Sequence, residues 1–148
     1  MLTKEIKESI DRSVLCWLAT SSEGSPNVSP KEVFTYYGEK SIIIANIASP
    51  QTLRNIRRNN SVCISFIDVL VQKGFKIKGK AEIIKKTDAR FHAMEKVLSK
   101  ITEGKFPFPT ITKITIGQAE KIIAPSYIFY PGTSEEEQIE SAKKRYKI

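Results

Sequence analysis

Residues 75–83 form the segment that most restricts the fold of this chain, because their apolar and polar side chains alternate. The residues on its two faces are Phe75, Ile77, Gly79, Ala81 and Ile83 on one side and Lys76, Lys78, Lys80 and Glu82 on the other. Successive side chains of a β-strand point to opposite sides of its sheet, so this pattern predicts a half-buried strand. One face of the sheet is expected to be core and the other solvated.

Five further segments are predicted to be strands, and they cover residues 14–20, 28–37, 42–45, 62–67 and 111–124. The turn-forming residues 21–27 between the first two predict a hairpin. Six strands joined largely by turns, with few helices, indicate a mainly β fold, a closed or nearly closed antiparallel barrel. Barrels of this size fill their interior with side chains, so a ligand is expected at the rim or between two copies.

Helices are expected around the barrel. Residues 1–13 predict an N-terminal helix capped by Thr3 with a one-sided apolar stripe, and residues 88–101 predict a second helix capped by Thr87. In residues 134–148 glutamates come first and lysines last, which complements a helix dipole and predicts a C-terminal helix. A disordered charged tail is the alternative there.

The 148 residues are interpreted as one domain, 1–148, long enough to bury about 70% of the surface of the unfolded chain. No apolar run approaches the roughly 18 residues of a membrane span, and the N-terminal segment lacks the apolar core of a signal peptide. We therefore expect a cytoplasmic protein.

Composition argues against several kinds of site. The two cysteines, Cys16 and Cys63, lie in apolar runs and are expected to be small core residues, and a single histidine, His92, supplies no metal-ligand cluster. No side chain stands out as a catalytic acid, base or nucleophile. The net charge of +8 would attract anions, including phosphorylated cofactors, and would favour association with polyanions without specificity. We predict neither a metal site nor a catalytic side chain.

Residues 41–60 contain the clearest candidate for a binding site. A β-branched run, Ile42–Ile44, leads to a predicted helix start with Ser49 at the cap, Pro50 at the first position and Thr52 two residues later. Free backbone N–H groups, the positive end of the helix dipole and two hydroxyls would meet there, which suits a phosphate. The alternative is that Ser49 only caps its own helix.

Four local motifs follow one another along the chain: 29–33 (SPKEV), 45–52 (ANIASPQT), 55–60 (NIRRNN) and 71–81 (VQKGFKIKGKA). In this order and spacing, the chain resembles the pyridoxamine 5′-phosphate oxidase-like flavoproteins, in their small single-domain form, from about residue 13 to residue 124. The resemblance implies a six-stranded antiparallel FMN-binding split barrel. It also implies a homodimer with the flavin at the interface.

The resemblance further implies which residues bind FMN. The second strand would pass along the flavin with Pro30, Lys31, Glu32 and Val33. The turn and helix start would hold the phosphate with Asn46, Ile47, Ser49, Gln51 and Thr52. The fifth strand would approach the ring or the ribityl chain with Gln72, Lys73 and Gly74. The implied function is an oxidoreductase or electron carrier in which the flavin itself performs the redox step.

Two departures from the family pattern bear on the substrate. The vitamin-forming oxidases have arginine and lysine where this chain has Gln51 and Thr52, and the C-terminal residues 125–148 do not match their substrate-binding region. One alternative is an F420-dependent reductase of the same fold. Another is a non-enzymatic basic binding module. The aromatic residues Tyr127, Phe129 and Tyr130 would line a pocket or fill the barrel end or dimer seam.

Overall fold

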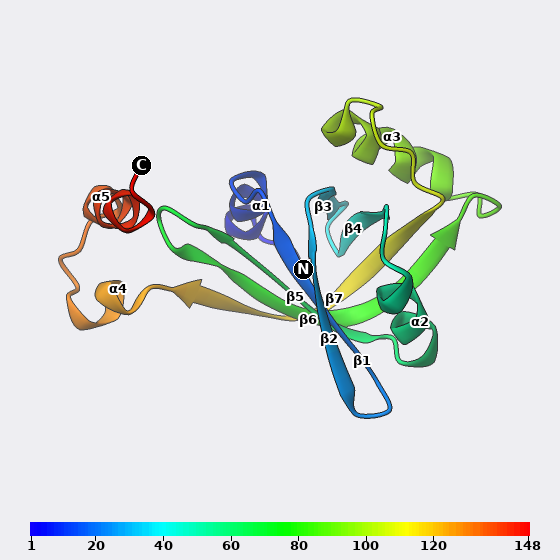
Figure 1. Ribbon diagram of the computed structural model, residues 1–148, viewed down its shortest axis with the longest axis horizontal. Helices are drawn as coiled ribbons and strands as arrows, with labels where there is room; N and C mark the ends of the chain where they lie inside the picture. Colours follow the sequence, from blue (N-terminus) through cyan, green and yellow to red (C-terminus); the bar gives the residue numbers. More distant parts are fainter.

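The computed structural model describes residues 1–148 and contains seven strands and five helices (Figure 1). The strands are β1 (Cys16–Ser22), β2 (Ser25–Lys31), β3 (Phe34–Tyr37), β4 (Ser41–Asn46), β5 (Ser61–Asp68), β6 (Lys73–Lys85) and β7 (Thr110–Ile123). The helices are α1 (Lys4–Asp11), α2 (Pro50–Arg58), α3 (Phe91–Thr102), α4 (Pro125–Phe129) and α5 (Glu135–Tyr146). Every strand pair is antiparallel, in the order β2-β1-β5-β6-β7-β4-β3, which confirms the predicted mainly β class.

The seventh strand arises because the predicted strand 28–37 is two strands. β2 pairs with β1, whereas β3 pairs with β4, so the chain crosses between two parts of the sheet at Glu32 and Val33. The Val33 carbonyl still accepts a hydrogen bond from the Ala45 amide, at 3.0 Å. β2 also begins earlier than predicted, because the β1–β2 turn needs only Glu23 and Gly24, both with positive φ.

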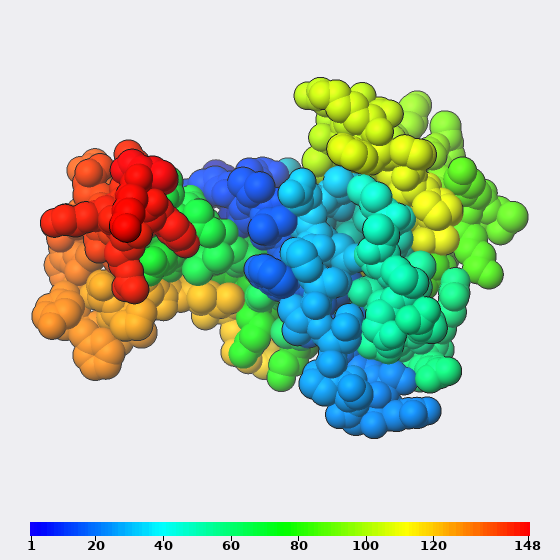
Figure 2. All heavy atoms as spheres, viewed as in Figure 1, coloured from blue at the N-terminus to red at the C-terminus, as the bar shows by residue number.

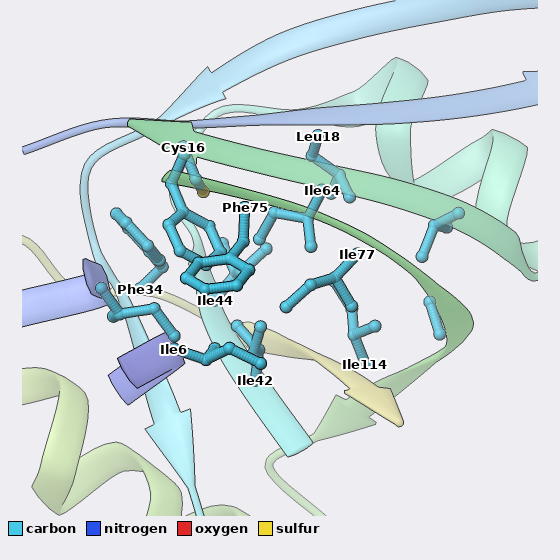
Figure 3. Packing of buried hydrophobic residues seen from close by; sticks show 14 of the residues in the cluster. Ile6, Cys16, Leu18, Phe34, Ile42, Ile44, Ile64, Phe75, Ile77 and Ile114 are labelled. Atoms are coloured by element: carbon cyan, nitrogen blue, oxygen red, sulfur yellow. The ribbon is translucent and has the colours of Figure 1, made fainter. Parts of the chain in front are cut away.

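The interior of the barrel is filled by sixteen buried apolar residues. In Figure 3, Cys16, Phe34, Ile44 and Ile77 come from different strands and point toward a common centre. Three phenylalanine rings add tilted contacts with centroids 6.2 and 6.3 Å apart. The N-terminal helix α1 adds its predicted apolar stripe to this cluster. Such packing leaves the rim and the outer surface as places for a ligand.

A second cluster of nine buried apolar residues lies where α3 packs on the sheet. α3 begins later than predicted, and Thr87 is not its cap; that prediction was wrong. Asp88 accepts a hydrogen bond from the Arg90 backbone amide at 2.9 Å, so a local turn precedes the helix. No helix of the protein is both long and apolar enough to cross a membrane.

The C-terminal residues form an arm that extends away from the barrel, at the left of Figures 1 and 2. α5 is an ordered helix as predicted, and the Ser134 hydroxyl caps it by accepting a hydrogen bond from the Glu137 amide at 3.1 Å. The unexpected short helix α4 is fixed by a hydrogen bond from the Tyr127 hydroxyl to the Val71 carbonyl, at 2.7 Å. The neighbouring Phe129 is exposed on the arm.

Candidate cofactor site

The most unusual side chain of the molecule is Lys31, at the end of β2. It is only 7% exposed, and its ammonium group donates a hydrogen bond to the hydroxyl of Ser49, yet no carboxylate lies within 4.0 Å of it. Burial lowers the pKa of Lys31, against a smaller opposing effect of the neighbouring Cys16. A buried cation without an anion is costly. The geometry therefore provides a place for an external anion.

Lys31 and Ser49 lie close together although they belong to different connections of the chain. Lys31 is the last residue of β2, just before the crossing to β3, and Ser49 lies between the end of β4 and the start of α2. Pro50 occupies the first turn of α2 as predicted, but the Ser49 side chain does not cap the helix. It accepts the Lys31 hydrogen bond instead, so the interpretation of Ser49 as a simple cap is not what the structure shows. The amides at the helix start have no acceptors within the helix and remain available to a ligand.

Other predicted phosphate contacts are engaged within the protein. Thr52 is almost fully buried, and its hydroxyl lies 3.0 Å from that of Ser29. The Gln51 side chain donates to Asn55 at 2.8 Å. The amide of Asn46 bonds to two threonine hydroxyls of β7, at 3.2 and 3.0 Å. These bonds fix the turn between β4 and α2, and direct contact of these side chains with a ligand stays a prediction.

A cleft of about 340 Å³ opens beside Lys31. Six predicted residues line it: Pro30, Lys31, Glu32, Val33, Ile47 and Ser49. Four lining residues were missed: Leu15, Ala45, Ala48 and Phe106. Of these, Phe106 had a signal, since it begins the Phe-Pro-Phe-Pro connection between α3 and β7. The volume is at the lower end of the roughly 300–1,000 Å³ found for ligand pockets.

The third predicted segment lies elsewhere in the chain. Gln72, Lys73 and Gly74 are at the base of the C-terminal arm, on the opposite side of Figure 1 from α2. Lys73 pairs with Glu135 of α5 at 3.0 Å. A Cβ on Gly74 would collide with the Phe66 carbonyl, so this glycine permits close approach of β5 and β6. A single chain does not bring this segment to the Lys31 cleft.

The groups at the cleft fit the phosphate end of a flavin nucleotide. The ammonium of Lys31, the hydroxyl of Ser49 and the amides at the start of α2 are the donors that a phosphate dianion requires. Val33, Ile47 and Phe106 supply apolar walls for the uncharged remainder. The lining thus combines the cation of Lys31 with apolar side chains, as an amphipathic nucleotide needs, and its one carboxylate is that of Glu32.

Comparison with known proteins identifies the family. The sequence profile of pyridoxamine 5′-phosphate oxidase matches residues 2–122, more than half of the chain. The chain belongs to the pyridoxamine 5′-phosphate oxidase family. No curated protein sequence matches it.

Solved structures of similar proteins confirm the split-barrel fold of this family member. HupZ of Group A Streptococcus is 26% identical over 84% of this chain and 99% of that chain, with a TM-score of 0.69. An FMN-binding protein from Syntrophomonas wolfei subsp. wolfei is 16% identical over 81% and 85%, with a TM-score of 0.66. An F420 reductase is 20% identical over 80% and 98%, with a TM-score of 0.61. At the last two identities the likeness shows the fold alone.

Proposed function

We propose that this pyridoxamine 5′-phosphate oxidase family member binds FMN in the Lys31 cleft and acts as an oxidoreductase or electron carrier. The observation that carries the proposal is the buried Lys31 ammonium, which has a serine hydroxyl but no carboxylate beside it. Families of this fold place a flavin nucleotide at the corresponding turn, and such a nucleotide would supply the missing anion. The fold neighbours described as FMN-binding and as F420 reductase support a flavin-type cofactor.

Each group at the cleft has a role in this proposal. Lys31 and Ser49 bind the phosphate, together with the backbone amides at the start of α2. Val33 and Phe106 flank the uncharged part of the cofactor and exclude water from it. The flavin, when bound, supplies the transfer of hydride or electrons. The protein residues therefore bind and orient the cofactor, and none of them is assigned an acid or base role.

The proposal includes a homodimer. The Gln72–Gly74 segment and the Lys31 cleft lie on opposite sides of one chain, so a cofactor that touches both needs two chains. Large apolar side chains also remain exposed on the paired strands β1 and β2, among them Trp17 of β1 and Val28 of β2. Analytical ultracentrifugation of the FMN-loaded protein is expected to give twice the mass of the chain. A monomer that binds FMN with full affinity would contradict the dimeric site.

The cofactor is tested by titrating FMN into the purified protein and following flavin fluorescence. We expect quenching that saturates at one FMN per chain, and Ser49→Ala is expected to weaken binding. Absence of quenching would overturn the proposal. Mass spectrometry of any cofactor released from the purified protein distinguishes FMN from F420. A non-enzymatic basic module would instead bind DNA or RNA in a strongly salt-dependent way that Ser49→Ala does not alter.

A further inference from the structure

A second cavity, of about 570 Å³, adjoins the Lys31 cleft. The two share three lining residues, Glu32, Val33 and Phe106, so a ligand in one lies next to a ligand in the other. The walls of this chamber come from the end of α1, the start of β3 and the end of α3 with the loop that follows. The chamber is therefore built by the elements that frame the barrel rim.

The charge of the chamber is opposite to that of the molecule. Three carboxylates line it, Asp11, Glu32 and Glu103, and its one cationic side chain is Lys105. Lys105 already pairs with Glu103 at 3.3 Å. Neither Asp11 nor Glu32 has a cationic group within 4.0 Å, although the chain carries a net charge of +8. The lining thus keeps two carboxylates whose charge is not neutralised by the protein.

Two buried hydroxyls in the lining add acceptors without adding donors. Ser13 is 9% exposed and donates its hydrogen to the Ser9 carbonyl at 2.8 Å. Thr102 is 5% exposed and donates to the Ser99 carbonyl at 3.2 Å. Because each hydroxyl hydrogen is committed to a carbonyl, these two groups offer a ligand only oxygen lone pairs, and the Thr102 oxygen already accepts one hydrogen bond from the Gly104 amide at 3.2 Å. The side chains of the polar lining as a whole hold three carboxylates and these two acceptor hydroxyls, against two donors, the Lys105 ammonium and the Thr35 hydroxyl.

The rest of the chamber is apolar. Six of its thirteen lining residues are hydrophobic: Ile10, Val14, Val33, Phe34, Ile101 and Phe106. A ligand that suits this chamber carries hydrogen-bond donors and positive charge on one side and hydrocarbon on the other. A phosphate would meet three carboxylates and only two side-chain donors, the Thr35 hydroxyl and Lys105, of which Lys105 already pairs with Glu103.

We propose that this chamber binds an unphosphorylated organic cation with an apolar group, such as a primary amine, and that this is the substrate class of the site. The placement beside the cofactor rests on the proposed function, whereas the preference for a cation rests on the chamber itself. Asp11 and Glu32 are the carboxylates that draw the cationic end, because neither is paired with a cation within the protein, and Ile101 and Phe106 contact the hydrocarbon.

Isothermal titration of the FMN-loaded protein at low salt tests this with three probes of similar shape: 2-phenylethylamine, 2-phenylethanol and 3-phenylpropanoate. We expect the amine to bind more tightly than the alcohol and the anion to bind least. Asp11→Asn is expected to weaken amine binding about two- to fivefold, the range for an exposed charge pair, and to leave alcohol binding unchanged. Glu8→Gln is the matched control, because Glu8 is an exposed carboxylate of the same helix outside the chamber.

Equal binding of amine and alcohol would overturn the inference, as would tighter binding of the anion. It would also fall if Glu8→Gln weakened amine binding as much as Asp11→Asn. FMN fluorescence recorded on the same samples separates this inference from the proposed function. Bound FMN without a cation preference refutes only the chamber assignment, and a cation preference without FMN binding refutes only the cofactor assignment.

Discussion

Replacing Lys31 by methionine should change stability and cofactor affinity in opposite directions. Methionine keeps a long, flexible side chain but removes a buried ammonium that no carboxylate neutralises. The free energy of unfolding of the FMN-free protein should rise, by about 1 kcal/mol or more, because a buried charge is replaced by an apolar group. The same change removes a charge-assisted hydrogen bond to the phosphate, which contributes about 1.5–3 kcal/mol. FMN should then bind about 10- to 100-fold more weakly.

Urea denaturation without FMN and fluorescence titration with FMN measure these two effects. Lys86→Met is the control, since Lys86 is an exposed lysine in the turn before α3, and it should change neither quantity.

The pH dependence gives a further check. Because burial lowers the pKa of Lys31, the unfolded chain holds that proton to higher pH, and the FMN-free stability of the wild type relative to Lys31→Met should rise as pH passes the lowered pKa. FMN affinity should fall over the same range, since phosphate binding needs the ammonium. If Lys31→Met were less stable than wild type without FMN and bound FMN equally well, the reasoning would be refuted.

Three other predictions concern the scaffold. Gly74→Ala should lower the free energy of unfolding by more than about 2 kcal/mol, because its Cβ would meet a β5 carbonyl. Gly132→Ala, whose Cβ would lie in open space, should change the free energy of unfolding by less than about 0.5 kcal/mol. Equal thermal stability of the two variants would contradict the close approach of β5 and β6. Burial raises the pKa of Cys16 from 9.0 to about 12, so the thiol loses its proton at lower pH in the unfolded chain than in the folded protein. Its contribution to the free energy of unfolding should therefore fall above pH 9.0, by up to about 1.4 kcal/mol per pH unit. Urea denaturation of Cys16→Ala should lack this decline. Thr52→Val should cost about 1 kcal/mol through its lost hydroxyl contact, and unchanged stability in urea would show that the contact with β2 contributes nothing.

Much of the fold was predictable because its strands carry local patterns. The alternation at residues 75–83 predicted the buried and solvated faces of β6. The dipole-complementing charges of residues 134–148 predicted α5. The break between β2 and β3 was not predictable, because Glu32 and Val33 carry no turn signal and only the pairing with different strands separates them. The start of α3 was missed because the Asp88 side chain closes a turn that competes with helix.

The candidate site was predictable where local chemistry defines it. Pro50 and Ser49 marked a helix start, and the β2 residues were placed by family resemblance. The sequence could not reveal that Lys31 is buried without a carboxylate, because burial depends on the crossing to β3. It also could not reveal that Phe106 reaches the cleft, since contacts made by a connecting loop depend on the packing of α3.

Comparing FMN with riboflavin tests the central claim most directly, because the two differ only in the phosphate that Lys31 and Ser49 are proposed to bind. Fluorescence titration of the wild-type protein should give an FMN affinity at least about tenfold higher than that for riboflavin, as expected for loss of one charge-assisted contact. Lys31→Met should bring the two affinities close together. Equal affinities of the wild-type protein for FMN and riboflavin would contradict the account.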